Sequence, residues 1–143
     1  MSARREYPDR PWIGIAVILF RGDTVLLVRR AQPPRAGEWS LPGGAQRLGE
    51  RAEEAARREL REETGVEAGR LRLAGVIDSL TPDAAGRLRF HYTILDYAGE
   101  WAAGEARPGG DVDRVAWAAL DALDGYGLTE AARRLIAEAA RRR

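Results

Sequence analysis

One helix-like segment lies between two regions of strand-like sequence, and this order limits the chain to a small set of folds. Ala52, Ala56 and Leu60 recur at a spacing of four, which gives the narrow apolar stripe of a helix. Gly65 is placed to end that helix, because glycine favours a left-handed C-terminal cap. Apolar runs rich in branched residues predict strands over residues 12–20, 25–30, 71–80, 87–97 and 112–118. We therefore expect an α/β fold with a mixed sheet and flanking helices.

The remaining segments predict turns, loops and a second helix. RGDT (21–24) predicts a hairpin between the first two strands, and TPDAAG (81–86) predicts a turn between the next two. Residues 31–44 and 98–111 predict two long loops. The tail LTEAARRLIAEAARRR (128–143) has apolar residues at helical spacing and arginines near its end, which suits the helix dipole. Because no repeat or linker divides its 143 residues, we expect one domain over residues 1–143.

The composition excludes several kinds of chemistry. The chain has no cysteine, no lysine and a single histidine, His91, which we expect to be structural, and all 23 basic residues are arginine. Thiolate catalysis, lysine nucleophiles and multi-histidine zinc sites are therefore excluded. The net charge of +1 argues for neither nucleic-acid nor membrane binding. The N-terminus lacks the apolar region of a signal peptide, and the run 12–20 is too short to span a bilayer, so we expect a cytoplasmic protein.

Three glutamates crowd one face of the expected helix. RELREETG (58–65) places Glu59, Glu62 and Glu63 at offsets of three and four, where each like-charge pair is destabilising by roughly 0.2–0.5 kcal/mol. Either arginines neutralise these carboxylates or a cation binds them. Arg58 lies four residues from both Glu54 and Glu62, so it can brace some carboxylates while others stay free.

The sequence before the helix adds to the cation hypothesis. LPGG (41–44) lets backbone approach a ligand closely, and Mg²⁺ prefers oxygen ligands and often accompanies phosphate. A phosphate-binding P-loop is the alternative for GAQRLGER (44–51), but Glu50 and Arg51 stand where that motif requires lysine and serine or threonine. A glutamate in the lysine position would repel phosphate, so the P-loop hypothesis fails.

The segment GAQRLGERAEEAARRELREETGV (44–66) resembles the Nudix box, G-x5-E-x7-R-E-U-x-E-E-x-G-U with U aliphatic. All nine specified positions are filled, by Gly44, Glu50, Arg58, Glu59, Leu60, Glu62, Glu63, Gly65 and Val66. GEWSLPGG, just upstream, and the order of the strands are also similar to Nudix hydrolases. The resemblance implies a Nudix-type α/β/α sandwich and a pyrophosphohydrolase that depends on Mg²⁺ or Mn²⁺.

The resemblance also implies roles for particular residues. It makes Glu59 and Glu63 the principal metal ligands, assisted by Glu62 and the carbonyl group of Gly44, with Glu50 and Arg58 supporting catalysis. Nudix enzymes often supply a further acid from the loop before the last strand. That loop holds Glu105, Asp111 and Asp113, and we select Asp111 as the catalytic residue, against the alternative of an aspartate that only caps the loop.

Substrate contacts are expected around the same loops, from Arg29, Arg30, Arg35, Trp39, Gly43 and Gly44. The arginines would contact phosphate, although arginines at strand ends are often merely solvated. Two roles stay open for Trp39, packing in the core and stacking on the base of the substrate.

The substrate is expected to be a small nucleotide, with a homodimer as the expected assembly. Pro82 stands sixteen residues after Val66, a position that the resemblance associates with ADP-ribose hydrolases. We therefore expect ADP-ribose or a related ADP-sugar to be cleaved to AMP and a sugar phosphate. The alternatives are a nucleoside triphosphate pyrophosphohydrolase, including one for oxidised nucleotides, and a Nudix-fold sensor without activity.

Overall fold

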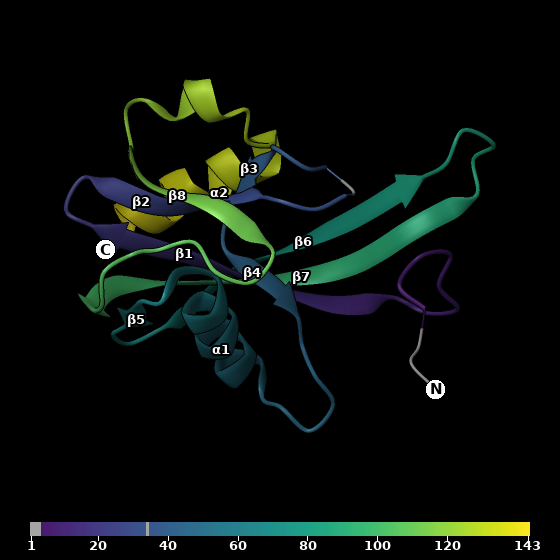
Figure 1. Ribbon diagram of the computed structural model, residues 1–143, viewed down its shortest axis with the longest axis horizontal. Helices are drawn as coiled ribbons and strands as arrows, with labels where there is room; N and C mark the ends of the chain where they lie inside the picture. The colour runs from purple at the N-terminus through teal and green to yellow at the C-terminus, as the bar shows by residue number, and fades with distance from the viewer. Residues whose placement is uncertain (1–3, 34) are drawn as a thin grey trace.

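A computed structural model describes residues 4–33 and 35–143. In these residues the chain forms the predicted helix, a second helix near the C-terminus, and strands that come before and after the first helix in the sequence (Figure 1). The elements are β1 (Trp12–Arg21), β2 (Thr24–Arg30), β3 (Trp39–Ser40), β4 (Gly43–Ala45), α1 (Ala52–Thr64), β5 (Glu67–Ala68), β6 (Arg72–Pro82), β7 (Leu88–Ala103), β8 (Val112–Ala119), the 3-10 helix η1 (Leu123–Tyr126) and α2 (Glu130–Arg141).

The strands form a mixed sheet built around β1 and β7, which run parallel to each other. β2 folds back antiparallel to β1, with Phe20 opposite Val25, so the first predicted hairpin is confirmed. β4 pairs with β1 nearer the start of that strand, at Gly14–Ala16. β6 and β7 form the second predicted hairpin, which extends beyond the rest of the molecule as a two-stranded arm (Figure 1).

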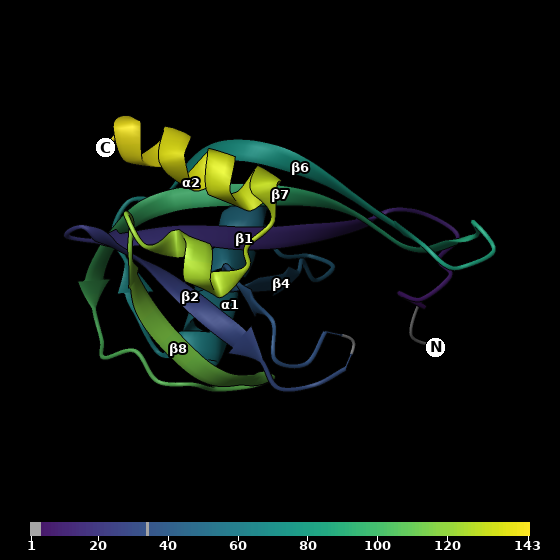
Figure 2. The same cartoon turned by 90° about the horizontal axis from the view of Figure 1, so that it is seen from above.

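Side chains of β1 alternate between two hydrophobic cores. Val17 and Leu19 pack with Leu60 of α1, whereas Ile18 and Phe20 pack with Ile136 of α2. This period of two follows from strand geometry, which points successive side chains to opposite faces. The two helices therefore cover opposite sides of the sheet, with α2 lying along one face in Figure 2. The predicted α/β/α sandwich with a mixed sheet is confirmed.

The ends of α1 show how local sequence sets its length. Gly65 adopts a left-handed conformation with φ of 75°, and its N–H donates to the carbonyl oxygen of Arg61 at 2.9 Å, so the predicted C-terminal cap is confirmed. At the other end, the Glu54 carboxylate accepts from the backbone N–H of Arg51 at 2.8 Å. The expectation that Arg58 braces Glu54 is wrong, because Glu54 instead satisfies this free donor at the start of the helix. No helix of the described ranges is long and apolar enough to cross a bilayer.

The predicted loop over residues 98–111 is partly wrong, because β7 continues to Ala103. Residues 98–100 keep pairing with β1, and Trp101 and Ala103 pair with β5. At Gly99 a Cβ atom would lie 2.6 Å from the carbonyl oxygen of Arg70, so this glycine serves close backbone packing, not a turn. Pairing with neighbouring strands therefore outweighs the loop-like composition. The strands β3, β4 and β5, of two or three residues each, are too short to give a sequence pattern.

Candidate active site

We call Glu59, Glu62 and Glu63 the acid cluster. It lies where α1 passes β4. The N–H of Gly43 donates to Oε1 of Glu63 at 2.8 Å. At Gly44 a Cβ atom would lie 2.5 Å from the Cδ atom of Glu59, so only glycine lets this carboxylate approach the strand so closely. The structure thus brings together four of the predicted residues, two from the strand and two from the helix.

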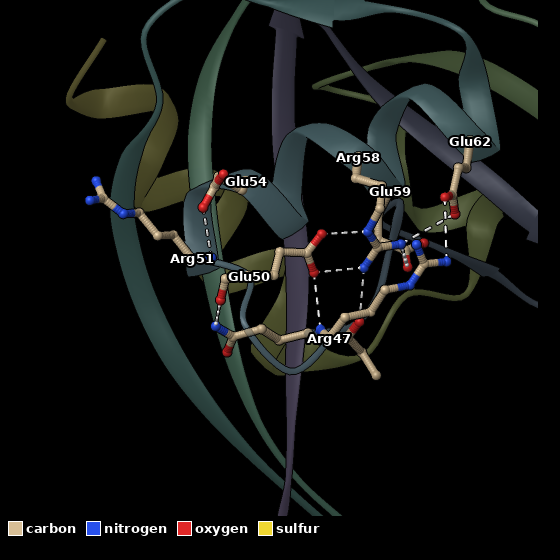
Figure 3. A network of polar contacts seen from close by, with 9 residues as sticks. Arg47, Glu50, Arg51, Glu54, Arg58, Glu59 and Glu62 are labelled. Carbon is tan, nitrogen blue, oxygen red and sulfur yellow. Dashed lines mark hydrogen bonds and ion pairs between the residues drawn. The ribbon is translucent and has the colours of Figure 1, made fainter. Parts of the chain in front are cut away.

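Arg58 is the centre of the polar network in Figure 3. Its Nε and Nη2 atoms donate to the two carboxylate oxygens of Glu50 at 2.6 and 3.0 Å. Its Nη1 atom donates to Glu59 at 2.7 Å and to Glu62 at 3.3 Å, and Nη2 also donates to the carbonyl oxygen of Ala45 at 3.1 Å. The Arg58 side chain is only 12% exposed, so its charge is poorly screened by water. One guanidinium therefore offsets much of the repulsion between the crowded glutamates.

Glu50 and Arg58 hold each other in the ionised state. The Arg58 guanidinium, followed by the backbone N–H of Arg47, lowers the pKa of Glu50 to about 2. Glu50 in turn raises the pKa of Arg58 above its usual range. Both oxygens of Glu50 are occupied by Arg58, which suits the supporting role expected of this residue.

Glu62 is the most exposed of the three clustered glutamates, Glu59, Glu62 and Glu63. Its side chain is 45% exposed and forms ion pairs with Arg58 and, at 3.6 Å, with Arg47. This places Glu62 at the rim of the cluster, with Glu59 and Glu63 farther inside.

Among the clustered glutamates, Glu63 has the pKa most strongly raised by its surroundings. Burial raises the pKa of Glu63 to about 7, although the N–H of Gly43 acts in the opposite direction. The charges of Glu59 and Asp111 raise this pKa further, and the charge of Arg30 lowers it. A cation bound beside these carboxylates would remove their repulsion and favour ionised Glu63.

The loop between β7 and β8 brings Asp111 to the cluster by docking on the C-terminal end of α1. The N–H groups of Arg107 and Gly109 donate to the carbonyl oxygens of Thr64 and Glu63, at 2.9 and 3.0 Å. These bonds satisfy acceptors that have no partner inside the helix. Asp111 follows directly, and its charge acts on Glu63.

The other two acids considered for this role lie elsewhere. The Glu105 side chain is 84% exposed and its nearest cation, Arg107, is 4.0 Å away. Asp113 forms a two-bond ion pair with Arg29. Of the three candidates, Asp111 is the one whose charge raises the pKa of Glu63.

The donor set fits a divalent cation, although it is not assembled as a finished site. Within residues 4–33 and 35–143, no three acidic or histidine side chains have the arrangement of a metal centre. Arg58 is the counter-charge of Glu59 and Glu62. The donors are all oxygens, Gly44 leaves room for the Glu59 carboxylate, and Glu63 is buried among negative charges. These properties suit a hard cation such as Mg²⁺ or Mn²⁺.

Arg29 and Arg30, two of the arginines expected to contact substrate, differ in their surroundings at the end of β2. Arg29 donates to both oxygens of Asp113, at 2.8 and 3.0 Å, and it shares a face of β2 with Leu27 of the core on the α2 side. A register shift in the pairing of β2 with β8 separates Arg30 from Arg29, and the charge of Arg30 acts on Glu63. Arg30 therefore acts on the acid cluster while Arg29 is paired with Asp113, and substrate binding by either arginine stays a prediction.

The remaining predicted substrate contacts lie outside the acid cluster. Trp39 packs edge-to-face on Tyr126, with ring centroids 5.1 Å apart, and contacts the core on the α2 side. Its role in base stacking stays a prediction. Arg35 lies in the exposed loop before β3, with a positive φ of 65°.

Asp96 is a buried carboxyl that sequence reasoning missed. It is 1% exposed in the middle of β7, and burial raises its pKa to about 7. The signal was an acid within the otherwise apolar run TILDY (93–97).

Comparison with known proteins identifies one matching family and several relatives. The family model described as the NUDIX domain matches residues 10–142. An ADP-ribose pyrophosphatase of Methanocaldococcus jannaschii is 34% identical over 113 residues, and the match covers 79% of this chain but only 64% of that protein's length. A putative 8-oxo-dGTP diphosphatase 2 of Mycobacterium tuberculosis is 36% identical over 130 residues, 90% of this chain and 88% of that protein. The crystal structure of a MutT NUDIX hydrolase from Burkholderia pseudomallei is 32% identical, with a TM-score of 0.79 and coverage of 91% of this chain and 98% of that one.

Proposed function

The chain belongs to the NUDIX family, and on this premise we propose that it is a divalent-metal-dependent pyrophosphohydrolase of nucleoside diphosphate derivatives. The observation that carries this proposal is the meeting of Glu59, Glu63 and Asp111 beside the glycines of β4. A filled Nudix box argues for catalysis and against a sensor that binds nucleotides without cleaving them.

Glu59 and Glu63 would hold the metal, with Glu62, the carbonyl group of Gly44 and Asp111 assisting. When bound, Mg²⁺ or Mn²⁺ supplies charge stabilisation at a phosphoryl oxygen and makes water a better nucleophile. Arg58 positions Glu59 through the 2.7 Å hydrogen bond, and the N–H of Gly43 positions Glu63. Phosphoryl transfer depends mainly on such positioning and charge stabilisation, so a site without cysteine or lysine is sufficient.

The proposed substrate is ADP-ribose or a related ADP-sugar, cleaved to AMP and a sugar phosphate. Pro82 supports this choice, as does the similarity to a protein named ADP-ribose pyrophosphatase. A nucleoside triphosphate, including an oxidised one, is the second candidate, favoured by the similarity to a putative 8-oxo-dGTP diphosphatase over 90% of this chain. A homodimer stays part of the proposal, to be checked by light scattering.

Product analysis with Mg²⁺ and with Mn²⁺ tests the substrate. We expect AMP and ribose 5-phosphate from ADP-ribose, with turnover at least about 100-fold lower in Glu63→Gln. Pyrophosphate released from a triphosphate, with ADP-ribose untouched at saturating Mg²⁺, would establish the second candidate in place of the first.

A further inference from the structure

A pocket of about 360 Å³ lies on the α2 side of the sheet, near the chain end that is marked C in Figure 2. Its floor is apolar and is formed by Phe20 of β1 and Ala98 of β7, which are each 1% exposed. Its walls carry charge, because four arginines and one glutamate line it: Arg70, Arg72, Arg142, Arg143 and Glu100. We call these four arginines the arginine group.

Two members of the arginine group have structural partners. Arg143 donates to both carboxylate oxygens of Glu100, at 2.7 and 2.8 Å, and its guanidinium lies 4.5 Å from the centroid of the Phe20 ring. The Nη2 atom of Arg72 donates to the carbonyl oxygen of Ala139 at 3.1 Å, which satisfies one of the acceptors left open at the end of α2. Helix capping and ion pairing therefore account for Arg72 and Arg143.

The other two members, Arg70 and Arg142, have no such explanation. Both are exposed, and neither side chain forms a hydrogen bond or an ion pair with another described residue. Their backbones are nevertheless fixed at the pocket. A Cβ atom at Gly99 would lie 2.6 Å from the carbonyl oxygen of Arg70, and the N–H of Arg142 donates to the carbonyl oxygen of Ala139 at 3.2 Å. The pocket thus holds two guanidinium groups whose donors are unused.

The arginine group concentrates positive charge in one place. Four guanidiniums surround one carboxylate, although the whole chain has a net charge of only +1. Asp23 is the second acid that acts on the pKa of Arg143, so the excess of positive charge lies with the other three arginines. Like charges that gather without counter-ions repel one another, and a bound anion would relieve that repulsion. The planar donor fork of a guanidinium matches the oxygens of a phosphate group.

We propose that this pocket binds the phosphate groups of a small anion, held by Arg70 and Arg142 together with the remaining donors of Arg72. Its volume is near the lower end of the range for small-molecule sites, about 300 Å³, which suits one or two linked phosphates. The low net charge argues against a polynucleotide as the ligand. The floor of the pocket belongs to the α2-side core, whereas the acid cluster lies beside β4 on the α1 side, so this anion site is independent of the proposed function.

Calorimetric titration with inorganic pyrophosphate in EDTA tests the proposal, because without divalent cations the carboxylates of the acid cluster repel phosphate. We expect the wild type to bind with a Kd of about 1 mM or tighter. The double variant Arg70→Gln/Arg142→Gln should bind at least about 10-fold more weakly, since it loses two charge-assisted contacts. The matched control is Arg134→Gln/Arg141→Gln, which removes the same charge from exposed arginines of α2 that line a separate hollow, and it should bind within about twofold of wild type.

The charge of the acid cluster supplies a second control. Glu63→Gln should bind pyrophosphate in EDTA as the wild type does, and a change in affinity there would place the anion at the acid cluster. The proposal would also be overturned by an absence of binding in EDTA, by equal binding in Arg70→Gln/Arg142→Gln and wild type, or by an equal loss in the control pair. Because no substrate is hydrolysed in this experiment, its outcome does not depend on whether ADP-ribose is the substrate.

Discussion

Glu59 and Glu63 occupy the positions in the cluster where a neutral replacement should matter most. Each carboxylate is held close to β4, Glu59 against Gly44 and Glu63 by the N–H of Gly43. Glu59→Gln and Glu63→Gln keep the shape of the side chain but remove the charge that a divalent cation needs. We expect each change to lower kcat by at least about 100-fold, in the range seen when a charge-stabilising group is lost.

The control for these variants is Glu53→Gln on the same helix. Glu53 is exposed in the first turn and forms only a surface ion pair with Arg57, so its replacement should leave kcat near wild type. Circular dichroism and urea unfolding would verify that all three variants fold. Near-normal turnover in both Glu59→Gln and Glu63→Gln would show that the metal is held elsewhere.

Asp111 lies outside the Nudix box, and the loop between β7 and β8 brings it to the acid cluster. Asp111→Asn should lower kcat by about 10-fold or more, and by removing a neighbouring negative charge it should also lower the pKa of Glu63. Asp113→Asn, which breaks only the pair with Arg29, is the matched control and should retain most activity. Steady-state kinetics over a range of pH measures both effects. Full turnover in both Asp111→Asn and Asp113→Asn would leave Glu105, or no residue of this loop, in the role.

Among the elements, the loop between β7 and β8 depends on its contact with α1. A Cβ atom at Gly109 would lie 2.5 Å from the carbonyl oxygen of Glu62, so Gly109→Ala should push the loop away from the helix end. We expect a loss of roughly 1–3 kcal/mol in the free energy of unfolding, together with lower kcat because Asp111 moves. Gly125→Ala is the control, since no atom lies within 4 Å of its added Cβ. A fully active and stable Gly109→Ala variant would mean that the docking is looser than the structure indicates.

Elements governed by local sequence could be predicted, and those governed by tertiary contacts could not. The length of α1 follows from its periodic apolar stripe and from Gly65, both visible in the sequence. The continuation of β7 over residues 98–103 depends on pairing with β1 and β5, which leaves no local pattern.

The same distinction holds within the site. The spacing of the box predicts Glu59 and Glu63 on one helical face, but the choice between Arg29 and Arg30 depends on which face of β2 each side chain occupies. The position of Asp96 opposite Gly75 depends on strand register, which the sequence alone did not provide.

For the whole molecule, the sandwich places its two carboxyl groups of raised pKa, Glu63 and Asp96, on opposite sides of the sheet. The acid cluster lies on the α1 side, beside β4, and Asp96 lies on the α2 side, at the centre of the sheet. β1 joins the two places, because Ala16 is the neighbour of both Gly43 and Asp96. The central strand therefore fixes the separation between the acid cluster and Asp96.

The burial of Asp96 should make the free energy of unfolding of the protein depend on pH. Its pKa is about 7 in the folded protein, against an ordinary value near 3.8. Below about pH 4 both states hold the proton, so Asp96→Asn and wild type should have similar stability. As the pH rises from about 4 to about 7 the unfolded state loses its proton first, so the wild-type free energy of unfolding falls relative to that of Asp96→Asn.

Above about pH 8 the difference should level off, at up to about 4 kcal/mol in favour of Asp96→Asn. Glu63 also has a raised pKa, but it is present in both proteins and cancels from the difference. Urea unfolding at a series of pH values measures this difference, with the exposed Asp78→Asn as the control that should show almost none. A difference between Asp96→Asn and wild type that stays constant with pH would mean that Asp96 is ionised in the folded protein, and that a counter-charge or water reaches it.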